Sequence, residues 1–130
     1  MVSMPRCPDA VVARARALIG TRFRPQGRSA AEGLDCIGLA ALAVDARNVP
    51  SDYALRSNPV GRLTDGLRAA GLVAVEEMAA GDVLVLVPGP AQLHLGIFTG
   101  TGLVHGDAAL RRVVERPLPL LWPILGIWRS

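Results

Sequence analysis

The sequence predicts an α+β domain, with helices in the first half and an antiparallel sheet of about five strands in the second half. Two observations predict this class. Apolar residues recur at helical spacing as far as about residue 70, and they follow the shorter period of strands after Glu77. The 130 residues are enough for one buried core. Because we find no repeat and no sign of a second domain, we expect residues 1–130 to form a single domain.

Three helices are expected in the first half of the chain, over residues 9–19, 36–46 and 63–70. Asp9 and Asp35 stand at the starts of the first two helices and are suited to cap them, because a carboxylate accepts hydrogen bonds from the free N–H groups there. Gly20 and Gly71 follow the first and third helices, and glycine is typical of helix ends. The intervening segments, rich in Gly, Pro and polar residues, are expected to be loops over residues 21–33 and 48–59.

The expected strands cover residues 83–87, 93–99, 103–105 and beyond, 112–116 and 124–128. Residues 100–102 form the hairpin turn between the second and third strands, so Phe98 is expected opposite Val104 or His105. In that register His94 and His105 need not pair directly. They can still share one face of the sheet near the start of the second helix.

Composition limits the classes of partner. All 14 basic side chains are arginines and the formal net charge is +3, which is too small and too scattered to indicate a nucleic-acid site. The arginines could still meet an anionic polymer such as a cell wall. Two cysteines, Cys7 and Cys36, do not make a disulfide framework. We find neither a secretory signal nor a membrane span, and therefore expect synthesis in the cytoplasm.

Cys36 is the candidate nucleophile, because it stands at the start of a helix and precedes the two histidines of the chain, His94 and His105. A free thiol has a pKa of roughly 8.5. A helix start stabilises an anion by roughly 0.3–1 kcal/mol, up to about 2, and one pKa unit is worth about 1.4 kcal/mol. The helix therefore lowers the pKa by about one unit, and Asp35 opposes it. We expect an imidazolium near Cys36 to hold the sulfur as thiolate.

We assign His94 as the general base and His105 as the residue that fixes its tautomer, because the strand of His94 follows a buried neighbour and is the more rigid platform. The backbone N–H of Cys36 is the expected oxyanion donor. A zinc site made of both cysteines and both histidines is the weaker alternative, since no pair has close ligand spacing.

Structural interpretations stand beside these assignments. Cys36 on its own could be a packed core thiol, and Asp35 is fully explained as a helix cap. Cys7 has no histidine near it in sequence and is expected to be an exposed or loosely packed thiol. Trp122 and Trp128 could belong to the core or to a docking surface.

Five segments of this chain resemble the NlpC-type cell-wall peptidases, which are bacterial and phage relatives of papain. The first contains the end of a helix and a glycine-bearing loop, and the second contains the nucleophile. The other three correspond to strands of the sheet. The five segments are residues 17–27, 33–39, 81–85, 94–97 and 104–106. The combination Asp-Cys-x-Gly-Leu followed by His-x-Gly-Ile is fairly specific, and the likeness covers nearly the whole chain.

The resemblance implies a papain-like fold and a cysteine endopeptidase that cleaves peptidoglycan stem peptides, typically between D-glutamate and a diamino acid. Cys36 is then the nucleophile, His94 the base and His105 the orienting residue, with no metal or other cofactor. The likeness is greatest to short peptidases encoded beside phage-tail or gene-transfer-agent genes. It therefore implies phage-tail-like protein partners and delivery to the cell wall on a particle.

Two positions depart from the family pattern. Phe23 stands where many relatives have a tyrosine, and Ile37 stands where relatives often have a serine. The resemblance implies that Phe23 and Asp35 contact the substrate, and Asp35 alone remains to hold the free amino group of the stem peptide. These departures keep two alternatives open: a non-catalytic assembly or structural module of a phage-like tail, and a papain-like amidase or acyltransferase.

Overall fold

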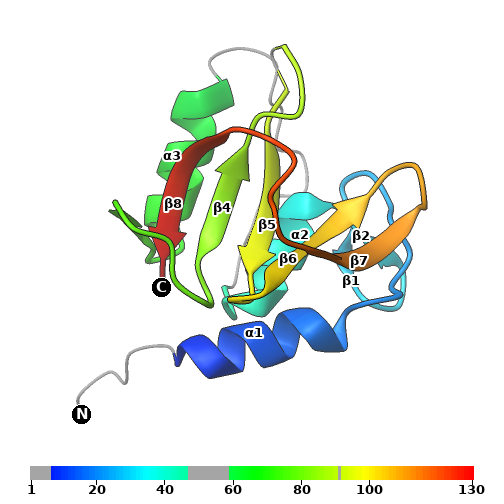
Figure 1. Cartoon of the computed structure of the whole chain (residues 1–130). Coiled ribbons are helices and arrows are strands. Elements are labelled where there is room, and N and C mark those ends of the chain that lie inside the picture. The colour runs from blue at the N-terminus through cyan, green and yellow to red at the C-terminus, as the bar shows by residue number, and fades with distance from the viewer. Residues whose placement is uncertain (1–6, 47–58, 91) are drawn as a thin grey trace.

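A computed structural model of the chain describes residues 7–46, 59–90 and 92–130. Its helices are α1 (Pro8–Ala17), α2 (Cys36–Ala43) and α3 (Pro59–Ala69). Its strands are β1 (Arg28–Ser29), β2 (Gly33–Leu34), β3 (Val73–Val75), β4 (Val83–Leu86), β5 (His94–Phe98), β6 (Gly102–Asp107), β7 (Arg112–Pro117) and β8 (Ile124–Arg129). The helices come first and pack on an antiparallel sheet, so the predicted α+β class is confirmed (Figure 1).

The main sheet has six antiparallel strands in the order β3-β8-β4-β5-β6-β7, and β1 and β2 form a separate two-stranded sheet. The expected five strands omitted β3, which pairs with β8 from the far end of the chain. They also omitted β1, which lies inside the expected loop over residues 21–33, and β2, which begins at the last residue of that loop. These strands are two or three residues long, so their pattern is too short to give a local signal.

Helix starts illustrate both a wrong and a confirmed prediction. Asp9 is not the cap of α1, because Pro8 takes the first helical position and Cys7 precedes it without a side-chain bond. Asp35 does cap α2, since its side chain accepts a hydrogen bond from the backbone N–H of Gly38 at 2.8 Å. The third helix begins earlier than expected, at Pro59. The rest of the loop expected over residues 48–59 lies outside the described residues.

The β5–β6 hairpin has a turn one residue shorter than expected, because Gly102 belongs to β6. Phe98 pairs with Leu103 and Gly96 pairs with His105, so the expected register is wrong. The cause is Thr99, whose backbone N–H donates to the Gly102 carbonyl at 2.9 Å and whose hydroxyl accepts from Gly102 N at 3.0 Å. Thr99 and Gly102 therefore lie opposite each other, and the turn between them is reduced to residues 100–101.

The sheet separates two apolar clusters. On one face the three helices pack against the larger cluster, whose sheet members include Val85, Leu95, Ile97, Val104 and Trp128. On the other face lies a smaller cluster of Leu84, Leu86, Phe98 and Leu103, with Trp122 packed against it. Since side chains alternate along a strand, each residue of β5 and β6 is assigned to a face by this pattern. Figure 1 shows α2 behind β5 and β6, and α1 across the end of the sheet.

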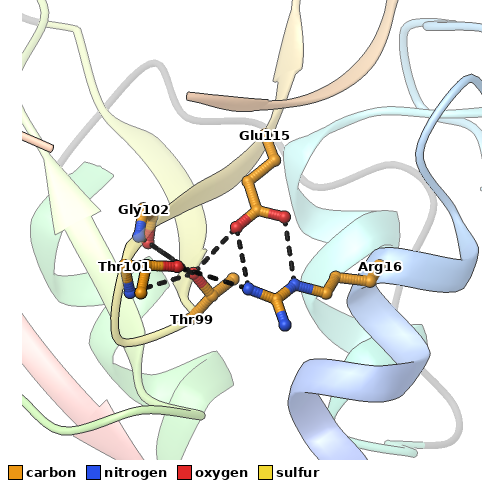
Figure 2. Close-up of polar contacts among 5 residues, drawn as sticks. All are labelled: Arg16, Thr99, Thr101, Gly102 and Glu115. Atoms are coloured by element: carbon orange, nitrogen blue, oxygen red, sulfur yellow. Dashed lines mark hydrogen bonds and ion pairs between the residues drawn. The ribbon is translucent and has the colours of Figure 1, made fainter. Parts of the chain in front are cut away.

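A polar cluster links α1 to the turn of the β5–β6 hairpin (Figure 2). The Arg16 guanidinium donates to both Glu115 oxygens, with both distances 3.0 Å. The Thr99 hydroxyl donates to Glu115 Oε2 at 2.9 Å. This cluster holds α1, β7 and the turn together at the end of β5 away from His94. Among the described residues, none of the helices is both long and apolar enough to cross a membrane.

Candidate active site

The start of α2 is fixed by the carboxylate of Asp35. Its Oδ1 accepts from Gly38 N at 2.8 Å and from Arg28 Nη1 at 2.7 Å, and its Oδ2 accepts from Gln26 N at 3.1 Å. Both carboxylate oxygens thus hold the loop before the helix to the first turn of the helix. This places the next residue, Cys36, at the first helical position with its backbone fixed.

The Cys36 thiol is half-buried and packs against the helix-side cluster. Burial raises the pKa of this thiol to about 11, and the charge of Asp35 also raises it. A hydrogen bond with the backbone of Leu95 and the charge of Arg28 lower the pKa by less. The thiol is therefore protonated at neutral pH. The expectation that Cys36 rests as a thiolate is wrong, because burial outweighs the helix start.

The two histidines form a hydrogen-bonded pair. His94 is the first residue of β5, and His105 lies in β6 opposite Gly96. Their side chains share the sheet face that carries Trp122, so the prediction of a common face is confirmed. This face is opposite to the one on which α2 packs, because His94 and His105 alternate with Leu95 and Val104 of the helix-side cluster. His94 Nε2 lies 3.0 Å from His105 Nδ1. One ring donates a proton and the other accepts it, which couples their tautomers.

Both imidazoles are neutral at pH 7. Burial lowers the pKa of His94 to about 4, and His105 lowers it further while the Asp107 carboxylate raises it. Burial also lowers the pKa of His105, and the neighbouring Arg116 cation adds to this effect. The Asp107 carboxylate opposes both causes at His105. A neutral His94 can accept a proton, which is what a general base requires.

The contact between Cys36 and His94 stays a prediction. Among the described residues, the thiol makes no hydrogen bond to either imidazole, and it is hydrogen-bonded to the backbone of Leu95. Cys36 packs on the helix face of the sheet, whereas the two imidazoles lie on the opposite face. His94 Nε2 is used by His105, which leaves Nδ1 as the nitrogen able to take the thiol proton. In the described part of the chain, no three His, Cys, Asp or Glu side chains are grouped to hold a metal ion.

Phe23 lies on the other side of β6 from the histidine pair. Its backbone N–H donates to the Arg111 carbonyl at 2.9 Å. Its ring is close to Gly106, since a Cβ atom at that glycine would lie 3.2 Å from Phe23 Cδ2. Phe23 therefore packs against Gly106, on the face of β6 opposite to the His105 side chain. Substrate contacts by Phe23 and Asp35 remain predictions.

Two residues beside the histidines were not predicted as part of the site. Trp122, between β7 and β8, contacts both imidazoles with its ring. Asp107 is 7% exposed, accepts from Arg116 and follows His105 by two positions in β6, on the same face. The strand period could have indicated Asp107. Trp122 has no such signal, because it reaches the pair from a loop distant in sequence.

Comparisons with known proteins show the fold of the chain. No family model matches the sequence, and no curated protein matches it. The solved structures that it resembles include the NlpC/p60 domain of the peptidoglycan hydrolase SagA, with a TM-score of 0.63 and 23% identity over 95% of this chain and 98% of that one. The P60 domain of an antigen from M. avium subspecies paratuberculosis gives a TM-score of 0.62 and 18% identity over 94% and 92%.

A third similar structure is RipD from Mycobacterium tuberculosis, described as a non-catalytic NlpC/p60 domain protein adapted to peptidoglycan binding. It gives a TM-score of 0.56 and 15% identity, and the match covers 95% of both chains. The chain therefore has the NlpC/p60 fold, a papain-like arrangement of helices on an antiparallel sheet. The fold includes both hydrolases and a non-catalytic protein, so activity must be argued from the site.

Proposed function

We propose that this protein is a cysteine peptidase that cleaves amide bonds of peptidoglycan stem peptides, at the bond between D-glutamate and a diamino acid. One observation carries the proposal: His94 Nε2 is bound to His105 Nδ1 at 3.0 Å, at the start of the strand that packs against the helix of Cys36. This bond orients His94 and leaves its Nδ1 to take the thiol proton. The transfer requires the imidazole to reach the thiol at the start of β5, since the two side chains lie on opposite faces of the sheet. The shared fold with a peptidoglycan hydrolase domain supports the choice of substrate.

The reaction starts from a neutral thiol and a neutral imidazole. As the Cys36 sulfur attacks the carbonyl carbon, its proton passes to His94 Nδ1, and His94 Nε2–H donates to His105 Nδ1. The backbone N–H of Cys36, which already interacts with its own thiol, stabilises the developing oxyanion. His94 then protonates the leaving amine as the C–N bond breaks. Water hydrolyses the resulting thioester and restores the thiol.

Digestion of defined stem peptides tests this proposal. Wild-type protein should release a fragment that ends in D-glutamate and a fragment that begins with the diamino acid, both identified by mass spectrometry. Cys36→Ala should release neither, while Cys7→Ala should keep wild-type activity because Cys7 is an exposed, free thiol. Wild-type protein that is inert on every stem type would contradict the proposal.

A second function is favoured by the state of the thiol. The pKa of Cys36 is raised to about 11, and within the described residues the thiol is not hydrogen-bonded to an imidazole. Both features suit a domain that binds peptidoglycan without cutting it, the role stated for RipD. Sedimentation with purified cell walls separates the two functions. A binding domain remains in the pellet without releasing peptides, whereas a peptidase releases them into the supernatant.

We further propose that the enzyme is carried on a phage-tail-like particle and acts at the cell wall. The resemblance to tail-encoded peptidases supports this delivery route, and the net charge of +3 suits contact with an anionic wall. Mass spectrometry of purified particles from the producing cells is the test. The protein should be enriched there with tail proteins, and its absence from particles would contradict the route.

A further inference from the structure

Three aromatic rings meet on the sheet face of the histidine pair. The ring centroids of His94 and His105 are 5.2 Å apart, and Trp122 lies 5.5 Å from the first ring and 5.4 Å from the second. The interplanar angles are 89°, 90° and 85°, so each pair is edge-to-face. This geometry is the preferred one for aromatic pairs. Trp122 therefore makes the same specific contact with both imidazoles.

The segment that carries Trp122 is held in place at both ends. Leu118 N donates to the Thr101 carbonyl at 3.2 Å, and Val87 N donates to the Pro123 carbonyl at 3.0 Å. Between these anchors, Leu120 and Trp122 pack against the small apolar cluster. The indole is half-buried, and the segment that carries it is anchored at both ends by backbone hydrogen bonds. An indole carried by an anchored segment can restrict the rotation of the two imidazole rings that pack against it.

The histidine pair needs such a restraint. The bond between His94 Nε2 and His105 Nδ1 is the hydrogen bond that joins the rings, and in the described residues His105 Nε2 is buried without a partner. His105 is 1% exposed, so bulk solvent does not reach that ring. A flip of the His105 ring would exchange Nδ1 for a carbon atom and break the bond to His94. Packing must therefore prevent the flip.

We propose that Trp122 is a positioning residue for the His94–His105 pair. Its indole fixes the orientation of both rings, keeps His105 Nδ1 aligned with His94 Nε2, and excludes water from this side of the pair. The effect on the orientation of the imidazole rings is argued from the packing alone. The effect on peptide cleavage rests on the proposed function.

The electrostatics of the pair agree with this role. Burial is the largest cause that lowers the pKa of each histidine, and Trp122 contributes ring contacts to both. The charged groups that act on the pair are Asp107 and Arg116. They form an ion pair at 3.1 Å, so their charges oppose each other at the histidines. Removing the indole should admit water and raise both histidine pKa values toward 6.5.

Nuclear magnetic resonance of the two histidines tests the inference directly. The imidazole Hε1 signals are titrated from pH 3 to 8 in wild type, Trp122→Phe and Trp122→Ala, and His94→Gln and His105→Gln assign them. In wild type the His94 midpoint should lie near 4. It should rise by one unit or more in Trp122→Ala, and by less in Trp122→Phe, which keeps an aromatic ring.

Leu120→Ala is the matched control, because Leu120 packs on the same cluster from the same segment and carries no aromatic ring. It should lower the melting temperature without moving the histidine midpoints. Unchanged midpoints in folded Trp122→Phe and Trp122→Ala would overturn the inference. If Trp122→Ala does not fold, unchanged midpoints in Trp122→Phe overturn it, and a raised His94 midpoint supports it.

Peptide cleavage provides the second measurement. Trp122→Ala should lower kcat by 10-fold or more with little change in KM, and the acid limb of its pH profile should move upward with the His94 midpoint. Trp122→Phe should restore part of kcat. Raised midpoints together with inert wild-type protein would support the positioning role and contradict the proposed peptidase. A shifted midpoint with an unshifted pH profile would overturn the link to catalysis.

Discussion

The two ends of the β5–β6 hairpin carry polar clusters of opposite character. At the turn end, Arg16 and Glu115 are charged, partly exposed and joined with Thr99 by short hydrogen bonds (Figure 2). At the open end, His94 and His105 are neutral and buried or half-buried, and one ring nitrogen has no partner in the described residues. The same pair of strands thus uses paired charges to fasten α1 at one end. At the other end it keeps proton acceptors unprotonated.

The comparison teaches where to look for chemistry in this fold. A hydrogen-bonded and solvated ion pair is stable and does not provide a reactive group for a substrate. Neutral imidazoles with lowered pKa values can accept a proton at neutral pH, and such perturbed groups are characteristic of functional sites. Variants at the two ends should therefore separate activity from stability.

The largest effect is expected at His94. His94→Ala removes the proton acceptor and should lower kcat/KM for stem-peptide cleavage by about 10²–10⁴-fold, the usual range for a general base. His105→Ala should cost less, because it removes only the orienting bond. Steady-state kinetics on one defined peptide gives both values. Equal activity of His94→Ala and wild type would contradict the assignment of the base.

The protonation state of the thiol gives the next effect. With a pKa of about 11, Cys36 should react with iodoacetamide at pH 7 about 10²-fold more slowly than an ordinary exposed thiol with a pKa of roughly 8.5. The rate should rise as the pH approaches 11. Alkylation is followed by intact mass in a Cys7→Ser background. A fast reaction that already levels off near pH 4 would instead indicate a thiolate–imidazolium pair.

Acid stability should depend on His94. Its pKa is 6.5 in the unfolded chain and about 4 in the folded protein, so the unfolded state binds more protons between these values. The free energy of unfolding should therefore fall as the pH decreases from 6.5 to 4, by about 1–2 kcal/mol after allowance for partial solvent exposure. Urea unfolding at several pH values measures it. His94→Gln should flatten this dependence, and an unchanged slope would contradict the lowered pKa.

The smallest effect is expected at the turn end. Glu115→Gln should lower the melting temperature by a few degrees at low salt and by less at high salt, because an exposed ion pair is screened. The Arg16 hydrogen bond holds the pKa of Glu115 below its usual value, so the contribution of the pair should disappear as the pH falls through that range. Peptide cleavage should stay at the wild-type rate. Loss of activity in Glu115→Gln would contradict the assignment of stability to the turn end and of activity to the open end.

Local signals predicted the parts of the site that depend on neighbouring residues. Asp35 as a helix cap and the common face of His94 and His105 follow from adjacent residues and from the strand period, and both are confirmed. The α+β class and the papain-like fold were likewise predictable. The association with phage tails or gene-transfer agents stays a prediction.

Contacts between residues remote in sequence determine the features of the fold and site that the sequence did not predict. The pKa of Cys36 depends on how deeply the first residue of α2 is buried against β5. The pKa lowering expected from the helix start did not include this burial. Trp122 reaches the histidines from a loop after β7, and β3 exists only because β8 pairs with it. In each case the deciding partner is remote in sequence, where periodicity and capping signals carry no information.

Acylation by an activated ester of a D-glutamate-containing stem fragment tests the central claim most directly, since a good leaving group lets the acyl-enzyme accumulate. Intact mass in a Cys7→Ser background should show one acyl group, mapped to Cys36, absent in Cys36→Ala and formed at least 10-fold more slowly in His94→Gln. An acylation rate equal in the presence and absence of His94, or no acyl group on Cys36 at all, would contradict the account.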